Sequence, residues 1–132
     1  MAGADATSDP LYVDALQARL SRVVALRADL ESELEAIAES TASVPDDEHD
    51  PEGSTVGYER ARVSALLARA HEEIEDLEAA LERVAGETYG RCESCGAAIG
   101  RERLVALPSA TRCVDCAAQT PSHRPTGASP KR

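Results

Sequence analysis

Four cysteines stand in two pairs near the C-terminal end of the chain, within YGRCESCGAAIGRERLVALPSATRCVDCA at residues 89–117. The pattern is C-x2-C-x17-C-x2-C, and it is formed by Cys92, Cys95, Cys113 and Cys116. A tetrahedral zinc site takes two thiolates from each of two tight turns, whereas a lone C-x-x-C can also be a redox pair. The doubled motif therefore predicts one structural Zn²⁺. With four protein ligands no position is open for water, so we do not expect a catalytic metal.

Four arginines surround this predicted metal site: Arg91, Arg101, Arg103 and Arg112. They have two interpretations, which the sequence leaves open. They can form a solubilising surface that also favours the thiolate state of the cysteines. Alternatively, they can contact a nucleic acid or an acidic protein surface at the base of the molecule.

The composition argues against several classes of protein. The net charge is −10 and the chain has a single Lys, which counts against direct DNA binding. No Ser/His/Asp or Cys/His arrangement is apparent, so we do not expect an enzyme. The N-terminus has neither a basic segment nor an apolar run, so we expect no signal peptide, no membrane anchor and a cytoplasmic location.

The elements that position the cysteines are predicted to be helices. The chain has no Phe, no Trp and only three Tyr, and its apolar residues are mainly Ala, Leu and Val, which suits helices packed along a narrow seam. Asp9-Pro10 is typical of a helix start. After it, coiled-coil spacing relates Val13, Leu16, Leu20, Val23, Arg27, Leu30, Leu34 and Ile37. The same spacing relates Arg60, Val63, Leu67, Ala70, Ile74, Leu77, Leu81 and Val84, and Gly86 marks the predicted end of this second helix.

The two runs fit one antiparallel register. Facing residues of an antiparallel hairpin have a constant sum of residue numbers, and pairs such as Leu30 with Leu67 and Leu20 with Leu77 each sum to 97. In this register Arg27 faces the small Ala70, which leaves room for its methylenes on the seam and its charge in water. We therefore predict an elongated, monomeric, mainly α protein whose long antiparallel coiled-coil hairpin spans residues 9–86.

The predicted turn of the hairpin is acidic. It lies between residues 48 and 49, in a tip loop at 44–54 that contains Asp46, Asp47, Asp50 and Glu52. The second helix begins either at Asp50-Pro51 or at Ser54, and the nearby glycines favour the later start. The remaining predicted segments are a flexible N-terminus at 1–8, a C4 zinc finger at 87–118 and a disordered basic tail at 119–132.

The cysteine region resembles the C4 zinc finger of the DksA/TraR family. The matching positions are Tyr89, Gly90, Cys92, Cys95, Gly96, Ile99, Arg103, Leu104, Ala106, Pro108, Cys113, Cys116 and Ala117. The resemblance implies a transcription regulator that binds RNA polymerase. Its coiled coil would enter the secondary channel of the enzyme and bring the acidic tip close to the catalytic magnesium.

Two departures from the family pattern concern the tip and the tail. The tip of the best-known members is Asp-x-x-Asp-x-Ala; here Asp47 and Asp50 match, but Glu52 replaces the alanine. Well-studied members also have a C-terminal helix that contributes basic residues to a ppGpp site, and a proline-rich tail stands there instead, so dependence on ppGpp is not expected. The alternatives left open are a structural or redox-sensing zinc protein and a DNA-binding zinc ribbon.

Overall fold

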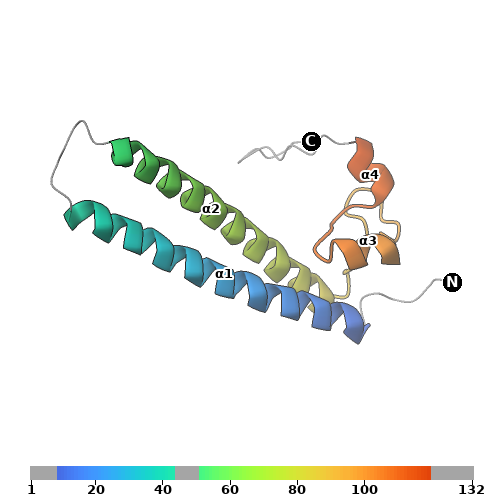
Figure 1. The fold of residues 1–132 in the computed structure, drawn as a ribbon. Helices are drawn as coiled ribbons and strands as arrows, with labels where there is room; N and C mark the ends of the chain where they lie inside the picture. The colour runs from blue at the N-terminus through green and yellow to red at the C-terminus, as the bar shows by residue number, and fades with distance from the viewer. Residues whose placement is uncertain (1–8, 44–50, 120–132) are drawn as a thin grey trace. The chain divides into compact units, whose positions relative to one another are not determined.

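The computed structural model of the chain describes residues 9–43 and 51–119, and these residues are mainly helical as predicted. The helices are α1 (Pro10–Ser43), α2 (Pro51–Ala85), α3 (Arg101–Ala106) and α4 (Val114–Gln119) (Figure 1). The described part contains no β-strand, although Arg91 and Ala98 form an isolated antiparallel bridge. The described residues divide into two compact units: the middle of the two long helices within Asp14–Ala79, and a second unit that contains residues 9–13 together with 80–119.

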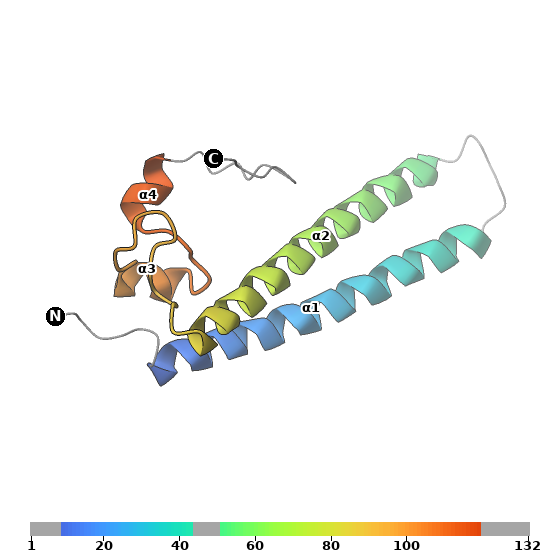
Figure 2. The same ribbon diagram turned by 180° about the vertical axis from the view of Figure 1, so that it is seen from behind.

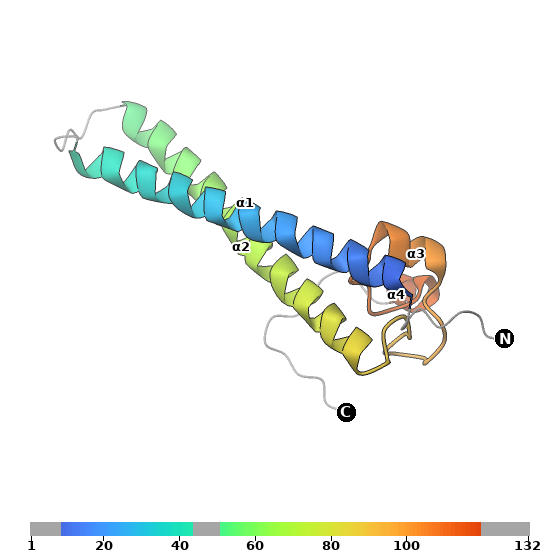
Figure 3. The same ribbon diagram turned by 90° about the horizontal axis from the view of Figure 1, so that it is seen from below.

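The first unit is the middle of the hairpin, in which α1 and α2 run side by side and antiparallel (Figures 1 and 3). Its buried residues all come from the two predicted seams: Leu16, Val23, Leu30, Val63, Ala70, Ile74 and Leu77. Arg27 is half-buried, as expected for a side chain that lays its methylenes on the seam. The seam predicted from the spacing of apolar residues is therefore the buried face of the hairpin.

Polar contacts between the two helices agree with the predicted register. Arg19 donates a hydrogen bond to Glu73, Arg62 lies 3.9 Å from the carboxylate of Glu33, and Arg60 donates to the Thr41 hydroxyl at 3.4 Å. The residue numbers of these pairs add to 92, 95 and 101, on either side of the predicted 97, because long side chains reach past the residue directly opposite. These pairs are exposed, so they contribute more to register than to stability.

The N-terminal ends of both helices carry proline at the first helical position. At α1 the Asp9 carboxylate accepts the Leu11 N–H at 2.9 Å and so caps the helix start that the sequence predicts at Asp9-Pro10. The expectation that the second helix starts at Ser54 is wrong, because α2 begins at Pro51. Proline at this position has a preset φ and lacks an N–H that would have no helical partner. The two glycines that follow cost about 1 kcal/mol each relative to alanine, which a helix of 35 residues absorbs.

The C-terminal end of α2 is a Schellman motif. The Thr88 N–H donates to the Arg83 carbonyl at 2.8 Å, and the Glu87 N–H donates to the Val84 carbonyl at 3.1 Å. The helix stops just before Gly86, as predicted, but the left-handed residue of the motif is Glu87, with φ 63°. A non-glycine residue thus takes the conformation that glycine most often supplies at this position.

Several predicted segments lie outside the described residues. These are the N-terminal segment 1–8, the tip residues Asp46, Asp47 and Asp50, and positions 120–132 of the predicted tail. Glu52 belongs to the first turn of α2, and its side chain is not described. Gln119, assigned to the tail from the sequence, is the last residue of α4. None of the helices described is long and apolar enough to cross a membrane.

The buried seam makes a specific prediction for two leucines. Leu77 is 1% exposed in the seam, whereas Leu26 is 49% exposed on α1. We expect Leu77→Ala to lower the free energy of unfolding by about 2 to 4 kcal/mol, because the substitution leaves a cavity. Leu26→Ala should change it by less than about 0.5 kcal/mol. Urea unfolding followed by far-ultraviolet circular dichroism measures both values, and equal effects would contradict the assigned seam.

Candidate metal centre

The four cysteine sulfurs converge on one point. All of them lie within 4.8 Å of one another, and the Sγ atoms of Cys95 and Cys113 are 3.9 Å apart. Zinc–sulfur bonds of about 2.3 Å in a tetrahedron require sulfurs roughly 3.8 Å apart, so the donor set fits a single zinc ion. The structure thus brings together the four cysteines that the sequence predicts as metal ligands.

The first pair of cysteines lies on a tight turn between α2 and α3 (Figure 2). The Gly96 N–H donates to the Cys92 carbonyl at 2.9 Å, and the Cys92 N–H donates to the Ala97 carbonyl at 2.8 Å. The turn needs a left-handed residue directly after the second cysteine, and Gly96 supplies it with φ 81°. The backbone thereby directs two sulfurs from one short loop toward the same point.

The second pair of cysteines is positioned by α4. Cys113 directly precedes this helix and its carbonyl accepts the Ala117 N–H at 2.9 Å, while Cys116 lies in the first turn. One helical turn thus separates the two residues, which places their sulfurs on the same side of the helix start.

The thiols of the site affect one another. Backbone N–H groups, chiefly that of Cys113, lower the pKa of the Cys92 thiol to about 6. Contacts with the sulfurs of Cys92 and Cys113 raise the pKa of the Cys116 thiol well above its usual range. Four thiolates this close together repel one another unless a cation lies among them. The chemistry of the donor set therefore also favours a bound divalent metal, which supplies charge neutralisation and cross-linking.

A small apolar core supports the metal site within the same unit. It consists of Tyr12, Ala80, Tyr89, Ile99, Leu104 and Ala110. Tyr89 is the largest fully buried side chain, its hydroxyl donates to the Pro108 carbonyl at 2.6 Å, and its ring centroid lies 5.8 Å from that of Tyr12. The first turn of α1 therefore contributes an aromatic side chain to the core around the zinc finger.

The role of Tyr12 was not predicted from the sequence. Tyr12 lies one turn before Leu16, but the predicted seam position there is Val13, which is only half-buried, whereas Tyr12 is buried. Its contact with Tyr89 does not follow from the coiled-coil spacing, since the spacing describes only the two long helices. The sequence feature that could have indicated this contact is the scarcity of aromatic residues. The chain has three tyrosines, and two of them pack against each other.

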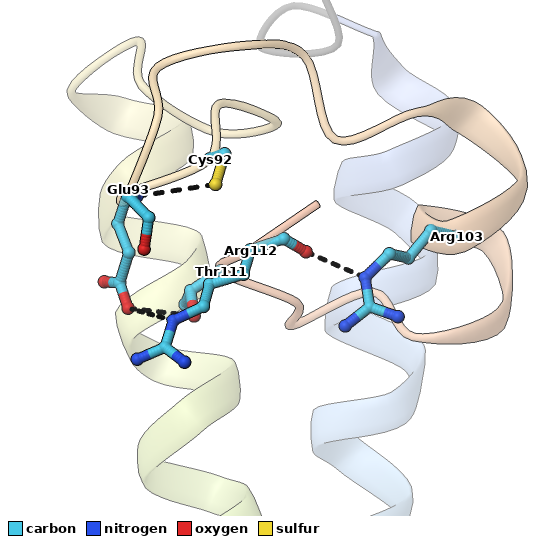
Figure 4. A network of polar contacts seen from close by, with 6 residues as sticks. Cys92, Glu93, Arg103, Thr111 and Arg112 are labelled. Carbon is cyan, nitrogen blue, oxygen red and sulfur yellow. Dashed lines mark hydrogen bonds and ion pairs between the residues drawn. The ribbon is translucent and has the colours of Figure 1, made fainter. Parts of the chain in front are cut away.

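The four arginines of the cysteine region differ in their surroundings. Arg91 is exposed and donates to the Gly96 carbonyl at 3.2 Å. Arg103 is half-buried, and its Nε donates to the Arg112 carbonyl at 2.8 Å (Figure 4). Arg112 in turn pairs with Glu93, whereas Arg101 is exposed at the start of α3. Among the arginines that the sequence offers for contact with a partner at the base of the molecule, Arg103 therefore already has a structural role inside the finger.

Residues 87–119 match the sequence model of the prokaryotic DksA/TraR C4-type zinc finger. The match covers both cysteine turns, α3 and α4, and the four clustered sulfurs are the donor set that it requires. Residues 87–119 therefore form a C4-type zinc finger similar to that of the DksA/TraR family. Its four cysteines bind one structural zinc ion.

Individual relatives agree with this assignment. The chain is 49% identical over 43 residues to the RNA polymerase-binding transcription factor DksA of Escherichia coli K12, covering 33% of this chain and 28% of that protein. It is 38% identical over 73 residues to the uncharacterised protein YteA of Bacillus subtilis, covering 55% of this chain and 30% of YteA. The chain thus spans less than a third of the length of these relatives.

The solved structure of the transcription factor DksA2 from Pseudomonas aeruginosa has a similar fold. The TM-score is 0.74 at 24% sequence identity, and the superposition covers 90% of this chain and 89% of the other. At this identity the likeness concerns the fold, and it supports the helical hairpin together with the small C-terminal module.

Loss of a single ligand should abolish the metal site. We expect Cys113→Ser to reduce bound zinc far below one ion per chain, because the hydroxyl is a much poorer zinc ligand than a thiolate. Ser94→Ala, within the first turn, should leave the zinc content unchanged, because Ser94 contributes its backbone N–H to Cys92 Sγ. Elemental analysis of the purified proteins measures the ratio. Full zinc retention by Cys113→Ser would contradict the C4 assignment.

The buried tyrosine predicts a contrast between two conservative substitutions. Tyr89→Phe removes the hydrogen bond to Pro108 and should cost about 1 kcal/mol, whereas Tyr58→Phe should be neutral because Tyr58 is 79% exposed. Burial also raises the pKa of Tyr89 to about 12. The neutral phenol therefore stabilises the fold fully below pH 10, and this contribution is lost as the pH rises toward 12. Thermal unfolding of zinc-loaded protein tests the substitutions, and equal melting temperatures for the two variants would contradict this role of Tyr89.

Proposed function

We propose that this protein is a transcription regulator that binds RNA polymerase and inserts its coiled-coil hairpin into the secondary channel to modulate initiation. The observation that carries the proposal is the similarity of its zinc finger region to DksA, a protein named as an RNA polymerase-binding transcription factor. The DksA2-like fold supports it, because the similarity in fold extends over nearly the whole chain. The proposal also places the protein in the cytoplasm as a monomer before it binds.

The hairpin has features that suit a narrow channel. It is only two helices thick, and a helix of 34 residues such as α1 is about 50 Å long at 1.5 Å per residue. The connecting segment carries Asp46, Asp47 and Asp50, and Glu52 follows at the start of α2. A group of carboxylates can change the electrostatic potential around a catalytic magnesium ion and nearby basic groups. We propose that Asp47 and Asp50 act at this tip.

The proposed polymerase contact at the base of the hairpin involves the arginines of the finger. Arg91 and Arg101 are exposed and can reach an acidic protein surface. Arg103 is retained in the proposed set, although its Nε is used inside the finger. The chain carries a net charge of −10, so an interaction with a protein surface is favoured over one with DNA phosphates. The proposal includes no ppGpp site.

The tip mechanism can be separated from polymerase binding by one pair of substitutions. We expect the wild-type protein to change transcript yield from a ribosomal RNA promoter in multi-round transcription by the host's own RNA polymerase. The double variant Asp47→Asn/Asp50→Asn should still bind polymerase but lose at least about 80% of the effect, because it removes the negative charge and keeps the size of both side chains. Co-elution on size exclusion measures binding separately from transcription.

A matched control removes two acids at the same spacing elsewhere on the hairpin. Glu72 and Glu75 are exposed on α2, so Glu72→Gln/Glu75→Gln has the same change in net charge and should behave as the wild type. Equal loss of activity in both double variants would assign the effect to overall charge and contradict a specific tip. Absence of polymerase binding by the wild-type protein would refute the proposed function itself.

A further inference from the structure

Glu93 connects the two cysteine turns. It follows Cys92 directly, and its carboxylate accepts a hydrogen bond from the Thr111 hydroxyl at 3.3 Å. The same oxygen lies 3.5 Å from Nε of Arg112, the residue before Cys113. The Glu93 N–H also donates to the Thr111 carbonyl at 2.8 Å. Figure 4 shows the Glu93 side chain extending away from the Cys92 sulfur toward this second segment.

The segment that Glu93 reaches is fixed from its other side by α3. Arg103 Nε donates to the Arg112 carbonyl at 2.8 Å, so the backbone just before Cys113 is attached to α3. Nε of Arg112 is buried and, within the part of the chain that the structure describes, makes no hydrogen bond of good geometry. The nearby Glu93 carboxylate is therefore the group that compensates its charge.

These contacts matter for the metal because each involves a residue next to a ligand. Zinc is retained only while both turns present their sulfurs at tetrahedral positions, and groups that orient ligands commonly change metal affinity by about 10- to 100-fold. We propose that Glu93 is a positioning residue, which holds the two turns together through Thr111 and Arg112 and thereby slows the release of zinc. The proposal concerns the finger alone and does not depend on polymerase binding.

Electrostatics alone predicts the opposite effect of removing Glu93 on the rate of zinc release, so a measurement of that rate tests the proposal. A zinc ion with four thiolates has a net charge of about −2, so a carboxylate nearby disfavours the complex by Coulomb repulsion. If Glu93 were a bystander, its removal would therefore slow zinc release or leave it unchanged. If Glu93 holds the turns together, its removal accelerates release.

The experiment follows zinc transfer from the full-length, zinc-loaded protein to the chromogenic chelator 4-(2-pyridylazo)resorcinol. We expect Glu93→Ala to release zinc about 10-fold faster than the wild type. This corresponds to the lower end of the range of effects on metal affinity given above, because the contacts of Glu93 are largely exposed. Glu93→Gln should fall between the two, since its amide oxygen still accepts from Thr111 but the ion pair is lost. Glu102→Ala is the matched control, because Glu102 is an exposed acid of the same finger.

A double variant identifies the route of the effect. If Glu93 acts partly through Arg112, then Glu93→Ala/Arg112→Ala releases zinc less fast than the product of the two single effects predicts. Release by both Glu93 variants at or below the rate of Glu102→Ala would overturn the proposal. If Glu93→Ala fails to fold, the isosteric Glu93→Gln alone shows whether removing the carboxylate speeds or slows zinc release.

Discussion

Tetrahedral coordination of one zinc ion is the constraint on which the C-terminal module depends. Its apolar core is small, and its two helices, α3 and α4, have six residues each, too few to be stable alone. Zinc binding supplies an apparent free energy of about 10 to 16 kcal/mol in comparable zinc-finger peptides. The conformation of the turns, including the left-handed Gly96, therefore has to be compatible first with four converging sulfurs.

The hairpin is stabilised in a different way, by many similar apolar contacts along one seam. Its buried side chains are leucine, valine, isoleucine and alanine, and no aromatic residue lies in the middle of the seam. The loss of one such side chain removes a fraction of the stability and leaves the register intact, since the remaining layers still specify it. The half-buried Arg27 is tolerated for the same reason, because its neighbours define the alignment around it.

Features with a strict sequence periodicity or spacing could be predicted, and features that depend on a single tertiary contact could not. The seam from Leu16 to Leu77 and the C4 ligand set follow from residue spacing alone. Of the two possible starts of α2, glycine propensity favours Ser54, but the helix begins at Pro51, because the cost of two glycines is small beside the length of the helix. The left-handed Glu87 and the Tyr12–Tyr89 contact were missed because no local pattern encodes them.

The Tyr12–Tyr89 contact also bears on modularity. The zinc finger is contiguous in sequence over residues 87–119, but the compact unit that contains it includes the first turn of α1 and the last turn of α2. A fragment cut at residue 87 would keep all four metal ligands and lose the aromatic ring that packs against Tyr89. The finger is therefore not an independent module. Any chimaera that transplants it has to include the first turn of α1 and the last turn of α2 as well.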